Sequence, residues 1–272
     1  MTAASPAAPD LPRARAAHPR LEAVASIDST NAELARREAL APQPHLTALV
    51  ALEQTAGRGR LDRRWSAPAG ASVAISVLIR SAVPVERRGL LTLLGGLAAR
   101  TAVAAQLPGS AVALKWPNDV LVGARKVVGV LAQLVPETGA VVLGAGINTA
   151  MTAAQLPVPT ATSIAIERGD AERVDPLGLA DAVVAGYLAA LDGLVARFEA
   201  ADGDLGRAGL HAELEAACST IGTRVRVELP DGSSSTGRAV GIGADGALLV
   251  VGREGGAPAP VLVGDITHLR LL

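Results

Sequence analysis

The sequence predicts an α+β protein in which a mixed β-sheet packs on helices and a small all-β unit follows at the C-terminus. Segments with the apolar pattern of buried strands alternate with too few helices for a strictly doubly wound sheet. From Ile221 onwards, short strand-like segments are separated by Asp-Gly turns, which is typical of a small barrel of about fifty residues. With 272 residues and 50% hydrophobic side chains, the chain is long enough for one sizeable core and a second small domain.

The chain divides into three regions. Residues 1–19 are rich in Ala, Pro and Arg without an apolar run, and we expect them to form a disordered tail. Residues 20–217 carry the alternating strands and helices and are expected to form the main domain. Residues 221–272 are the predicted barrel.

The first strand, at 21–29, is expected to lead directly into a helix. Thr30 and Glu33 have the spacing of a capping box, so this helix is predicted to begin at Thr30 and to end near Leu40. The same apolar patterns predict further strands at 46–54, 72–80, 111–116, 126–134 and 140–148, and further helices at 84–106, 176–200 and 204–217.

Composition excludes several classes of function. A formal net charge of −1 argues against a protein that holds nucleic acid by bulk electrostatics. The single cysteine, Cys218, excludes an internal disulfide framework, and the four histidines show no metal-ligand spacing. Arg100 and Asp192 interrupt the longest apolar runs, which therefore stay below the roughly 18 residues of a membrane span. We expect a soluble, cytoplasmic protein that binds neither nucleic acid nor membrane.

Lysine and asparagine are rare and gather in a few polar segments. Only two lysines, Lys115 and Lys126, stand beside 23 arginines. A chain that fills nearly every cationic position with Arg is expected to keep Lys where a guanidinium cannot serve. The asparagines are Asn31 in DSTN, Asn118 in WPND and Asn148 in GAGIN. We therefore expect these segments, with the neighbouring tryptophans, to meet in one polar site.

A loop with the sequence GRGRLDRRW occupies residues 57–65. Glycine lets the backbone approach a ligand closely, and Arg offers planar bidentate donors to phosphate or carboxylate. No Gly-Lys-Ser/Thr follows, so the loop is not a Walker phosphate loop. The alternative is a solvated basic loop or an RNA-binding patch.

The segment KWPND ends a predicted strand, and Pro117 prevents that strand from simply continuing. Asp119 beside Asn118 offers oxygen ligands to magnesium, which commonly bridges a protein carboxylate and a substrate phosphate. Lys126, on the outgoing strand of the hairpin, is expected to direct its charge at the same ligand. The alternatives are a turn-forming Asn-Asp pair and a surface lysine.

The remaining motifs are less specific. GAGIN ends a strand with small residues, which permits close approach of a ligand or simply tight packing. Ser29, Thr30 and Asn31 form either a polar binding segment or only a helix cap. No Ser/His/Asp or Cys/His set is apparent, so we expect no covalent enzyme intermediate.

Taken together, DSTN, QTAGRGR...RRW, KWPND...K, GAGIN and the downstream ATS resemble the biotin protein ligase family, also known as biotin–[acetyl-CoA-carboxylase] ligases. The motifs occur in the family's order from about Leu21 to Leu272. The resemblance implies a catalytic domain like that of class II aminoacyl-tRNA synthetases and an SH3-like C-terminal barrel. No helix-turn-helix pattern precedes the first strand, so we expect the monofunctional type without an N-terminal DNA-binding domain.

The resemblance also implies a two-step reaction. Biotin and MgATP give biotinyl-5'-AMP and pyrophosphate, and a lysine of a biotin carboxyl carrier protein domain of acetyl-CoA or acyl-CoA carboxylase then attacks the anhydride. A free carboxylate is a poor electrophile, and its activation concentrates negative charge on phosphate oxygens. Arginine, lysine and Mg²⁺ stabilise this negative charge.

Site residues follow from the family motifs. The residues expected to bind biotin are Ser29, Thr30, Asn31, Gln54, Gly57, Arg58, Arg60, Lys126 and Gly129. Those expected at ATP and the adenylate are Arg60, Trp65, Asn118, Gly146 and Asn148. The expected catalytic residues are Lys126, Arg60, Lys115 and Asp119, and Asp119 is also the candidate Mg²⁺ ligand.

This chain departs from the family pattern at two places. Many members have Gly where Asp62 stands, and a carboxylate inside the arginine loop is expected to form a salt bridge or lower the loop's charge. Val127 and Val128 stand where members often have small residues, and are expected to narrow the pocket floor.

Two alternative functions remain open at this stage. A lipoate-type acyl-protein ligase shares the fold and the acyl-adenylate strategy, although GRGR with KWPND...K favours biotin. A nucleic-acid-binding module would use the Arg-rich loop and the small barrel. Against it, the chain has only four aromatic residues, which leaves little surface for base stacking.

Overall fold

The computed structural model describes residues 7–60, 63–228, 233–252, 255–262 and 265–268. Seven strands form one mixed sheet in the order β1-β2-β3-β7-β6-β5-β4. β1 and β2 are parallel, and the remaining neighbours are antiparallel. The strands are β1 (Leu21–Ile27), β2 (Thr47–Gln54), β3 (Val73–Ile79), β4 (Val112–Lys115), β5 (Asp119–Val122), β6 (Arg125–Leu134) and β7 (Val141–Ile147). The predicted α+β class with a mixed sheet is confirmed.

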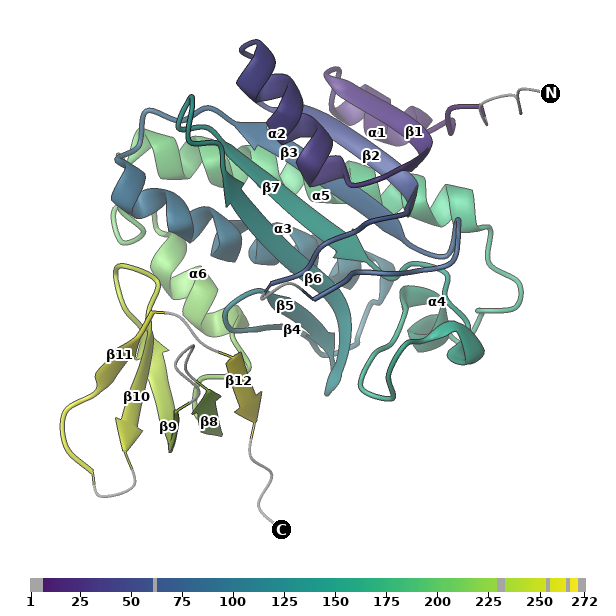
Figure 1. Cartoon of the computed structure of the whole chain (residues 1–272). Coiled ribbons are helices and arrows are strands. Elements are labelled where there is room, and N and C mark those ends of the chain that lie inside the picture. Colours follow the sequence, from purple (N-terminus) through teal and green to yellow (C-terminus); the bar gives the residue numbers. More distant parts are fainter. Residues whose placement is uncertain (1–6, 61–62, 229–232, 253–254, 263–264, 269–272) are drawn as a thin grey trace.

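Helices cover both faces of this sheet. The α-helices are α1 (Pro12–Ala17), α2 (Thr30–Leu40), α3 (Leu91–Gln106), α4 (Ile164–Arg168), α5 (Pro176–Ala200) and α6 (Leu210–Ala217). Two short 3-10 helices are η1 (Val85–Leu90) and η2 (Ala153–Gln155). Figure 1 shows α3 and α5 behind the sheet and α2 in front of it. The helix predicted at 84–106 is thus a 3-10 turn followed by α3, and the helix predicted at 204–217 begins only at Leu210.

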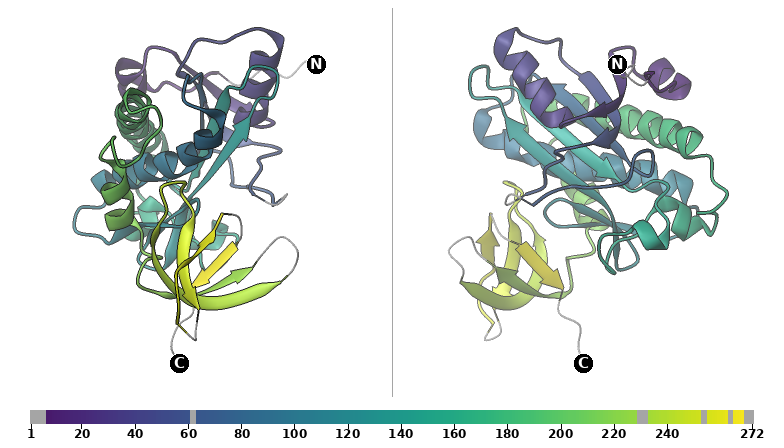
Figure 2. Two further views of the ribbon diagram at one scale, coloured as in Figure 1. Left: turned by 90° about the vertical axis from the view of Figure 1, so that its left-hand side faces the viewer. Right: turned by 45° about the vertical axis from the view of Figure 1, so that its right-hand side comes forward.

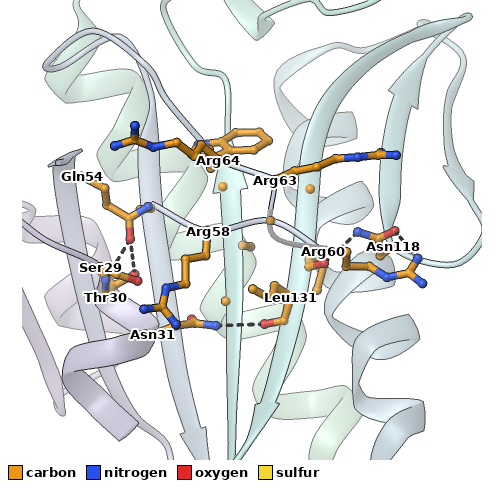
Figure 3. A pocket seen from close by; sticks show the side chains of 18 of the residues that line it. Ser29, Thr30, Asn31, Gln54, Arg58, Arg60, Arg63, Arg64, Asn118 and Leu131 are labelled. Atoms are coloured by element: carbon orange, nitrogen blue, oxygen red, sulfur yellow. Dashed lines mark hydrogen bonds between the residues drawn. The ribbon is translucent and has the colours of Figure 1, made fainter. Parts of the chain in front are cut away.

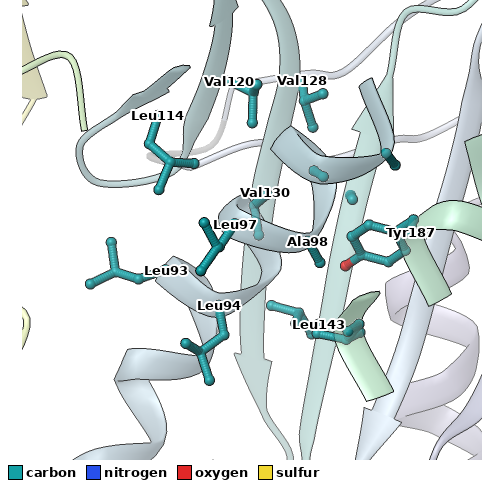
Figure 4. Packing of buried hydrophobic residues seen from close by; sticks show 14 of the residues in the cluster. Leu93, Leu94, Leu97, Ala98, Leu114, Val120, Val128, Val130, Leu143 and Tyr187 are labelled. Carbon is teal, nitrogen blue, oxygen red and sulfur yellow. The ribbon is translucent and has the colours of Figure 1, made fainter. Parts of the chain in front are cut away.

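The main core lies between the sheet and the pair α3 and α5. Leu94, Leu143 and Tyr187 are fully buried in it (Figure 4). Two helical segments are long and apolar enough to cross a membrane by length and composition alone: Val85–Gln106, which joins η1 to α3, and α5. More than half of the apolar part of each lies buried inside the domain. Their apolar character is therefore explained by packing on the sheet.

A smaller apolar cluster fills the space under α2, on the opposite face. Its members are Leu34, Leu49, Leu78, Val135, Ala140 and Val142. Along β3 and β7, residues of the two clusters alternate with period two, because successive side chains of a strand point to opposite faces. Beyond this cluster, toward β4, the front face is left open for a site.

α1 lies inside the segment predicted to be a disordered tail, and for these residues the prediction is wrong. Leu11 and Ala14 are fully buried. The carboxylate of Asp181 on α5 accepts the backbone N–H groups of Arg13 and Ala14 at 3.1 and 2.9 Å. A carboxylate at a helix N-terminus satisfies donors that have no partner within the helix, and composition cannot reveal a cap supplied from 167 residues away.

α2 begins at Thr30 and ends at Leu40 as predicted, but its capping residue differs from the prediction. Ser29, not Thr30, is the N-cap, and its hydroxyl accepts the N–H of Ala32 at 3.4 Å. Thr30 is the first helical residue, so its side chain is directed toward β2 and β3 instead of capping the helix. This shift makes the Thr30 hydroxyl available to the site.

The C-terminal unit is a five-stranded antiparallel sheet in the order β11-β10-β9-β8-β12. Its strands are β8 (Arg224–Glu228), β9 (Ser234–Ile242), β10 (Leu248–Gly252), β11 (Ala259–Val261) and β12 (Asp265–His268). Figure 2 shows this sheet at the end of the larger domain that is remote from α1 and α2. The Nε1 of the buried Trp116 donates to the carbonyl of Gly246 at 2.9 Å, and its backbone N–H donates to the Thr220 hydroxyl at 3.1 Å. Trp116 therefore joins the two units.

Candidate active site

The three neighbouring strands β3, β7 and β6 form the floor of a cavity of about 180 Å³ on the front face. Two rows of residues in register cross these strands. The first row is Ser76, Gly144 and Leu131, and the second is Ala74, Gly146 and Gly129. Because both β7 positions are glycine, side chains from outside the sheet can lie directly on the backbone there.

Asn31 and Trp65 occupy these two places. A Cβ added at Gly144 would lie 2.1 Å from Oδ1 of Asn31, and one added at Gly146 would lie 2.5 Å from the Trp65 ring. The two glycines of GAGIN are thus required by close approach of side chains. The open cavity lies between the asparagine and the tryptophan.

The end of the cavity near α2 is lined by uncharged polar groups. The backbone N–H of Thr30 donates to Oε1 of Gln54 at 2.8 Å, and the Thr30 hydroxyl lies 3.1 Å from the same oxygen. Nδ2 of Asn31 donates to the Leu131 carbonyl at 3.1 Å (Figure 3). The exposed Arg58 extends over this end toward Asn31.

The opposite end carries a lysine–aspartate pair. Nζ of Lys126 lies 2.6 Å from Oδ1 of Asp119 and 5.8 Å from the centroid of the Trp65 ring. The Asp119 side chain is 19% exposed and the Lys126 side chain 36%, so the pair faces the cavity at its rim.

A β-bulge directs Lys126 into the cavity. β5 and β6 pair Val120 with Val128 but Leu121 with Lys126, so Val127 is left without a partner in this register. Strict alternation would place Lys126 on the core face with Val128; the extra residue turns it to the cavity face beside Asp119. Val127 and Val128 are both fully buried in the main core. The expectation that they narrow the pocket floor is therefore wrong.

The arginine loop crosses above the cavity. The N–H of Trp65 donates to the Gly57 carbonyl at 3.0 Å, so the loop folds back on itself. Arg60 donates to Oδ1 of Asn118 at 3.2 Å, which connects the loop to the segment between β4 and β5 (Figure 3). Asp62, for which a salt bridge was expected, lies outside the described residues.

Most of the residues expected from the sequence line this one cavity. They are Ser29, Thr30, Asn31, Gln54, Arg58, Arg60, Trp65, Asn118, Asp119, Lys126, Gly129 and Gly146. Motifs up to 117 residues apart in the chain, from Ser29 to Gly146, thus meet in one place.

Three expected residues lie outside the lining. A Cβ at Gly57 would lie 2.5 Å from the Trp65 carbonyl oxygen, so this glycine shapes the loop. Lys115 is opposite Asp119 in the β4–β5 register and therefore sits one strand nearer the sheet edge. Asn148 donates to the Thr162 carbonyl at 2.9 Å and so fixes the ATS segment, which pairs with the Lys126 backbone.

Sequence reasoning missed several residues of the site. Ser76 is fully buried, and its hydroxyl lies 2.7 Å from that of Thr30 and 2.6 Å from Oδ1 of Asn31. The available signal was a lone polar residue inside the apolar strand VAISVLI. Leu131, Arg63 and Arg64 also line the cavity.

The described part of the lining is strongly cationic. Its charged residues are Arg58, Arg60, Arg63, Arg64, Lys126 and Asp119. Five cations around one carboxylate suit an anionic ligand such as a phosphate. No group of three or more potential metal-ligating side chains occurs among the described residues.

The fold and the cavity together define a protein of the biotin and lipoate ligase class. Residues 23–148 match the Biotin/lipoate A/B protein ligase family, and residues 220–269 match the Biotin protein ligase C terminal domain. The chain is 36% identical to the biotin–[acetyl-CoA-carboxylase] ligase of Mycobacterium tuberculosis over 92% of this chain and 90% of that protein. It therefore belongs to the biotin protein ligase family.

Further relatives agree with this assignment. The bifunctional ligase/repressor BirA of Bacillus subtilis is 30% identical over 86% of this chain and 69% of that protein. The biotin protein ligase of Aquifex aeolicus in complex with biotin and ATP superposes with a TM-score of 0.71 at 25% identity, covering 92% of this chain and 99% of that one. The Leishmania major enzyme in complex with biotinyl-5-AMP gives a TM-score of 0.52 at 26% identity, over 88% and 96% of the two chains.

Proposed function

We propose that the protein is a biotin–[acetyl-CoA-carboxylase] ligase that works in two steps. An oxygen of the biotin carboxylate attacks the α-phosphorus of ATP, forming biotinyl-5'-AMP and releasing pyrophosphate. The amine of a carrier-domain lysine then attacks the acyl carbon, loses a proton and releases AMP. The acceptor is the biotin carboxyl carrier domain of acetyl-CoA carboxylase, and the reaction takes place in the cytoplasm.

The chemical difference between the two ends of the cavity carries this proposal. Biotin has an uncharged, hydrogen-bonding ring system at one end and a carboxylate at the other. Beneath Arg58, the uncharged hydrogen-bonding groups of Thr30 and Asn31 suit the ring, and the end with Lys126 suits the carboxylate. Trp65 between them offers an apolar surface on the glycine floor.

Lys126 is the principal catalytic residue in this proposal. In the free protein its ammonium is paired with Asp119 at 2.6 Å, which holds it at the cavity face. The ammonium contacts the biotin carboxylate and the α-phosphate while they become joined, and so stabilises the negative charge that accumulates there. The adjacent Trp65 ring, 5.8 Å from Nζ, restricts the positions that the ammonium can adopt.

Arg60 and the arginine loop retain the adenylate in this proposal. The Arg60–Asn118 hydrogen bond of 3.2 Å draws the loop across the cavity. A guanidinium in this position contacts the phosphate of biotinyl-AMP and keeps water from the anhydride.

Mg²⁺ fits this site as a partner of the nucleotide. Mg²⁺ is commonly bound by one or two carboxylates together with substrate phosphates and water. Asp119 is the one carboxylate among the described lining residues, so it is the group that would hold the ion. The bound ion would neutralise phosphate charge during adenylation.

Biotin-dependent pyrophosphate release tests this proposal. We expect pyrophosphate release with ATP and biotin, and then transfer of labelled biotin to a carrier domain. Lipoic acid and octanoic acid serve as competing substrates, because the matched family includes lipoate ligases. Release with lipoic acid but not with biotin would contradict the proposal in favour of a lipoate-type ligase.

A further inference from the structure

The side chain of Asn31 spans three strands of the sheet. Its Nδ2 donates to the carbonyl of Leu131 on β6 at 3.1 Å, and its Oδ1 lies 2.6 Å from the hydroxyl of Ser76 on β3. Gly144 on the intervening β7 is in register with both partners. The amide therefore lies flat over a glycine, between an acceptor on one side and a donor on the other.

Ser76 fixes the orientation of this amide. Turning the amide by 180° would bring its oxygen against the Leu131 carbonyl, where neither atom has a proton to share. Ser76 is fully buried and Asn31 is only 7% exposed, so water is a poor replacement for a lost partner between them. Buried polar groups without partners are costly, and the amide is expected to stay in this orientation as long as the serine donates to it.

Ser76 also fixes the hydroxyl of Thr30, 2.7 Å away. A serine hydroxyl has one proton, and Oδ1 of Asn31 has none, so at 2.6 Å Ser76 donates to the asparagine. The Thr30 hydroxyl then has two acceptors for its own proton, Ser76 at 2.7 Å and Oε1 of Gln54 at 3.1 Å, and the same Gln54 oxygen accepts the Thr30 N–H at 2.8 Å. The result is a hydrogen-bond network in which Ser76 contacts Thr30 and donates to Asn31, and Asn31 donates to the β6 backbone.

This hydrogen-bond network determines which polar atoms remain free to bind a ligand. The proton of the Thr30 hydroxyl is used within the protein, by Ser76 or Gln54, so this hydroxyl offers a lone pair to the cavity, and Asn31 retains one N–H of Nδ2. An acceptor beside a donor complements a cyclic urea, which presents N–H and C=O groups side by side. Ser76 itself does not line the cavity, although both residues that it orients do.

We infer that Ser76 is a positioning residue for ligand recognition, which sets the hydrogen-bonding pattern that Thr30 and Asn31 present to the urea ring. This inference rests on the proposed function, because it takes biotin as the ligand. Ser76 acts on binding of the ring and not on the reacting carboxylate, which belongs at the Lys126 end of the cavity.

The test compares Ser76→Ala with Ser72→Ala in the full-length protein. Ser72 is also buried and lies just before β3, but it does not line this cavity. For Ser76→Ala we expect the Kd and KM for biotin to rise roughly tenfold, the change for one oriented hydrogen bond. The kcat at saturating biotin and the KM for ATP should change less than about twofold, since the reacting end is untouched. Ser72→Ala should leave all four constants near wild type.

A double-mutant cycle shows whether Ser76 acts through Asn31. In an Asn31→Ala background, Ser76→Ala should raise the KM for biotin clearly less than in the wild type, because only the contact of Ser76 with Thr30 is left to be lost. A full tenfold rise in that background would overturn the inference, as would a wild-type biotin KM or an equal loss in kcat for Ser76→Ala alone. Absence of biotin-dependent pyrophosphate release by the wild-type protein would instead contradict the proposed function itself.

Discussion

Lys126 and Asp119 form an ion pair of 2.6 Å on adjacent strands, and a β-bulge in β6 places Lys126 on the cavity face beside Asp119. Without the unpaired Val127, alternation would direct the lysine into the apolar core. The sequence shows that lysine is rare, but the bulge is what makes this lysine reach the site.

Lys126→Arg should slow adenylate formation although it preserves the charge. Nζ lies among Trp65, Asp119 and Gly129, and a Cβ added at Gly129 would lie only 3.2 Å from it, so a planar guanidinium has little room to adopt the same position. The expected loss of transition-state stabilisation is roughly 2 to 4 kcal/mol, the scale for one oriented donor. Single-turnover pyrophosphate release measures it. Lys115→Arg, outside the cavity lining, is the matched control, and equal rates for both variants would contradict the prediction.

Gly144→Ala should impair biotin binding more than it impairs folding. The new methyl would lie 2.1 Å from Oδ1 of Asn31, so the asparagine must move away from Leu131 and Ser76. We expect at least a tenfold rise in the KM for biotin and a loss of about 1 to 3 kcal/mol in the free energy of unfolding.

Gly193→Ala on α5 is the control for that variant, because an added Cβ there meets nothing within 4 Å. It should raise helix stability by about 0.5 to 1 kcal/mol and leave the KM for biotin unchanged. A wild-type biotin KM in Gly144→Ala would show that Asn31 is not held on the glycine floor as described.

Arg60→Gly should release biotinyl-AMP before the carrier domain captures it. The substitution removes the hydrogen bond to Asn118 that draws the loop across the cavity. We expect labelling of lysines on a bystander protein mixed with the enzyme, ATP and biotin. Asn118→Ala should increase bystander labelling in the same direction. Bystander labelling at background, with carrier labelling still measurable, would mean that Arg60 does not retain the adenylate.

His18 should make stability depend on pH. Its hydrogen bond with Asp192, and secondarily that with the Leu46 carbonyl, raises the pKa of this imidazole above its ordinary value in spite of burial. Protonation therefore stabilises the folded state. The stabilisation is fully present below the unfolded pKa of about 6.5 and is lost as the pH rises through the higher folded pKa. Denaturant unfolding across this range should show a steeper decline for the wild type than for His18→Gln, and parallel profiles would refute the assignment.

The sequence predicted the helices and strands better than the long-range contacts between them. Rare residues such as Lys126 and Asn31 identified the segments of the site, and these segments do meet. Ser76 was not predicted as a site residue, because the other residues of its strand have the apolar pattern of a buried core strand. Local patterns do not specify register or long-range packing. Three features depend on these: the capping of α1 by Asp181, the unpaired Val127, and the position of Lys115 one strand nearer the sheet edge.

Because Trp65 lies over Gly146 in the cavity, its intrinsic fluorescence is expected to respond to a bound ligand. Its Nε1 is buried and has no hydrogen-bond partner in the described part of the chain, so a ligand that supplies an acceptor or displaces the ring changes its surroundings. The other tryptophan, Trp116, is buried and bonded to the C-terminal sheet, away from this cavity. A Trp116→Phe protein would therefore carry a single indole whose emission wavelength reports occupancy of the ligand site directly, without a label or a coupled reaction.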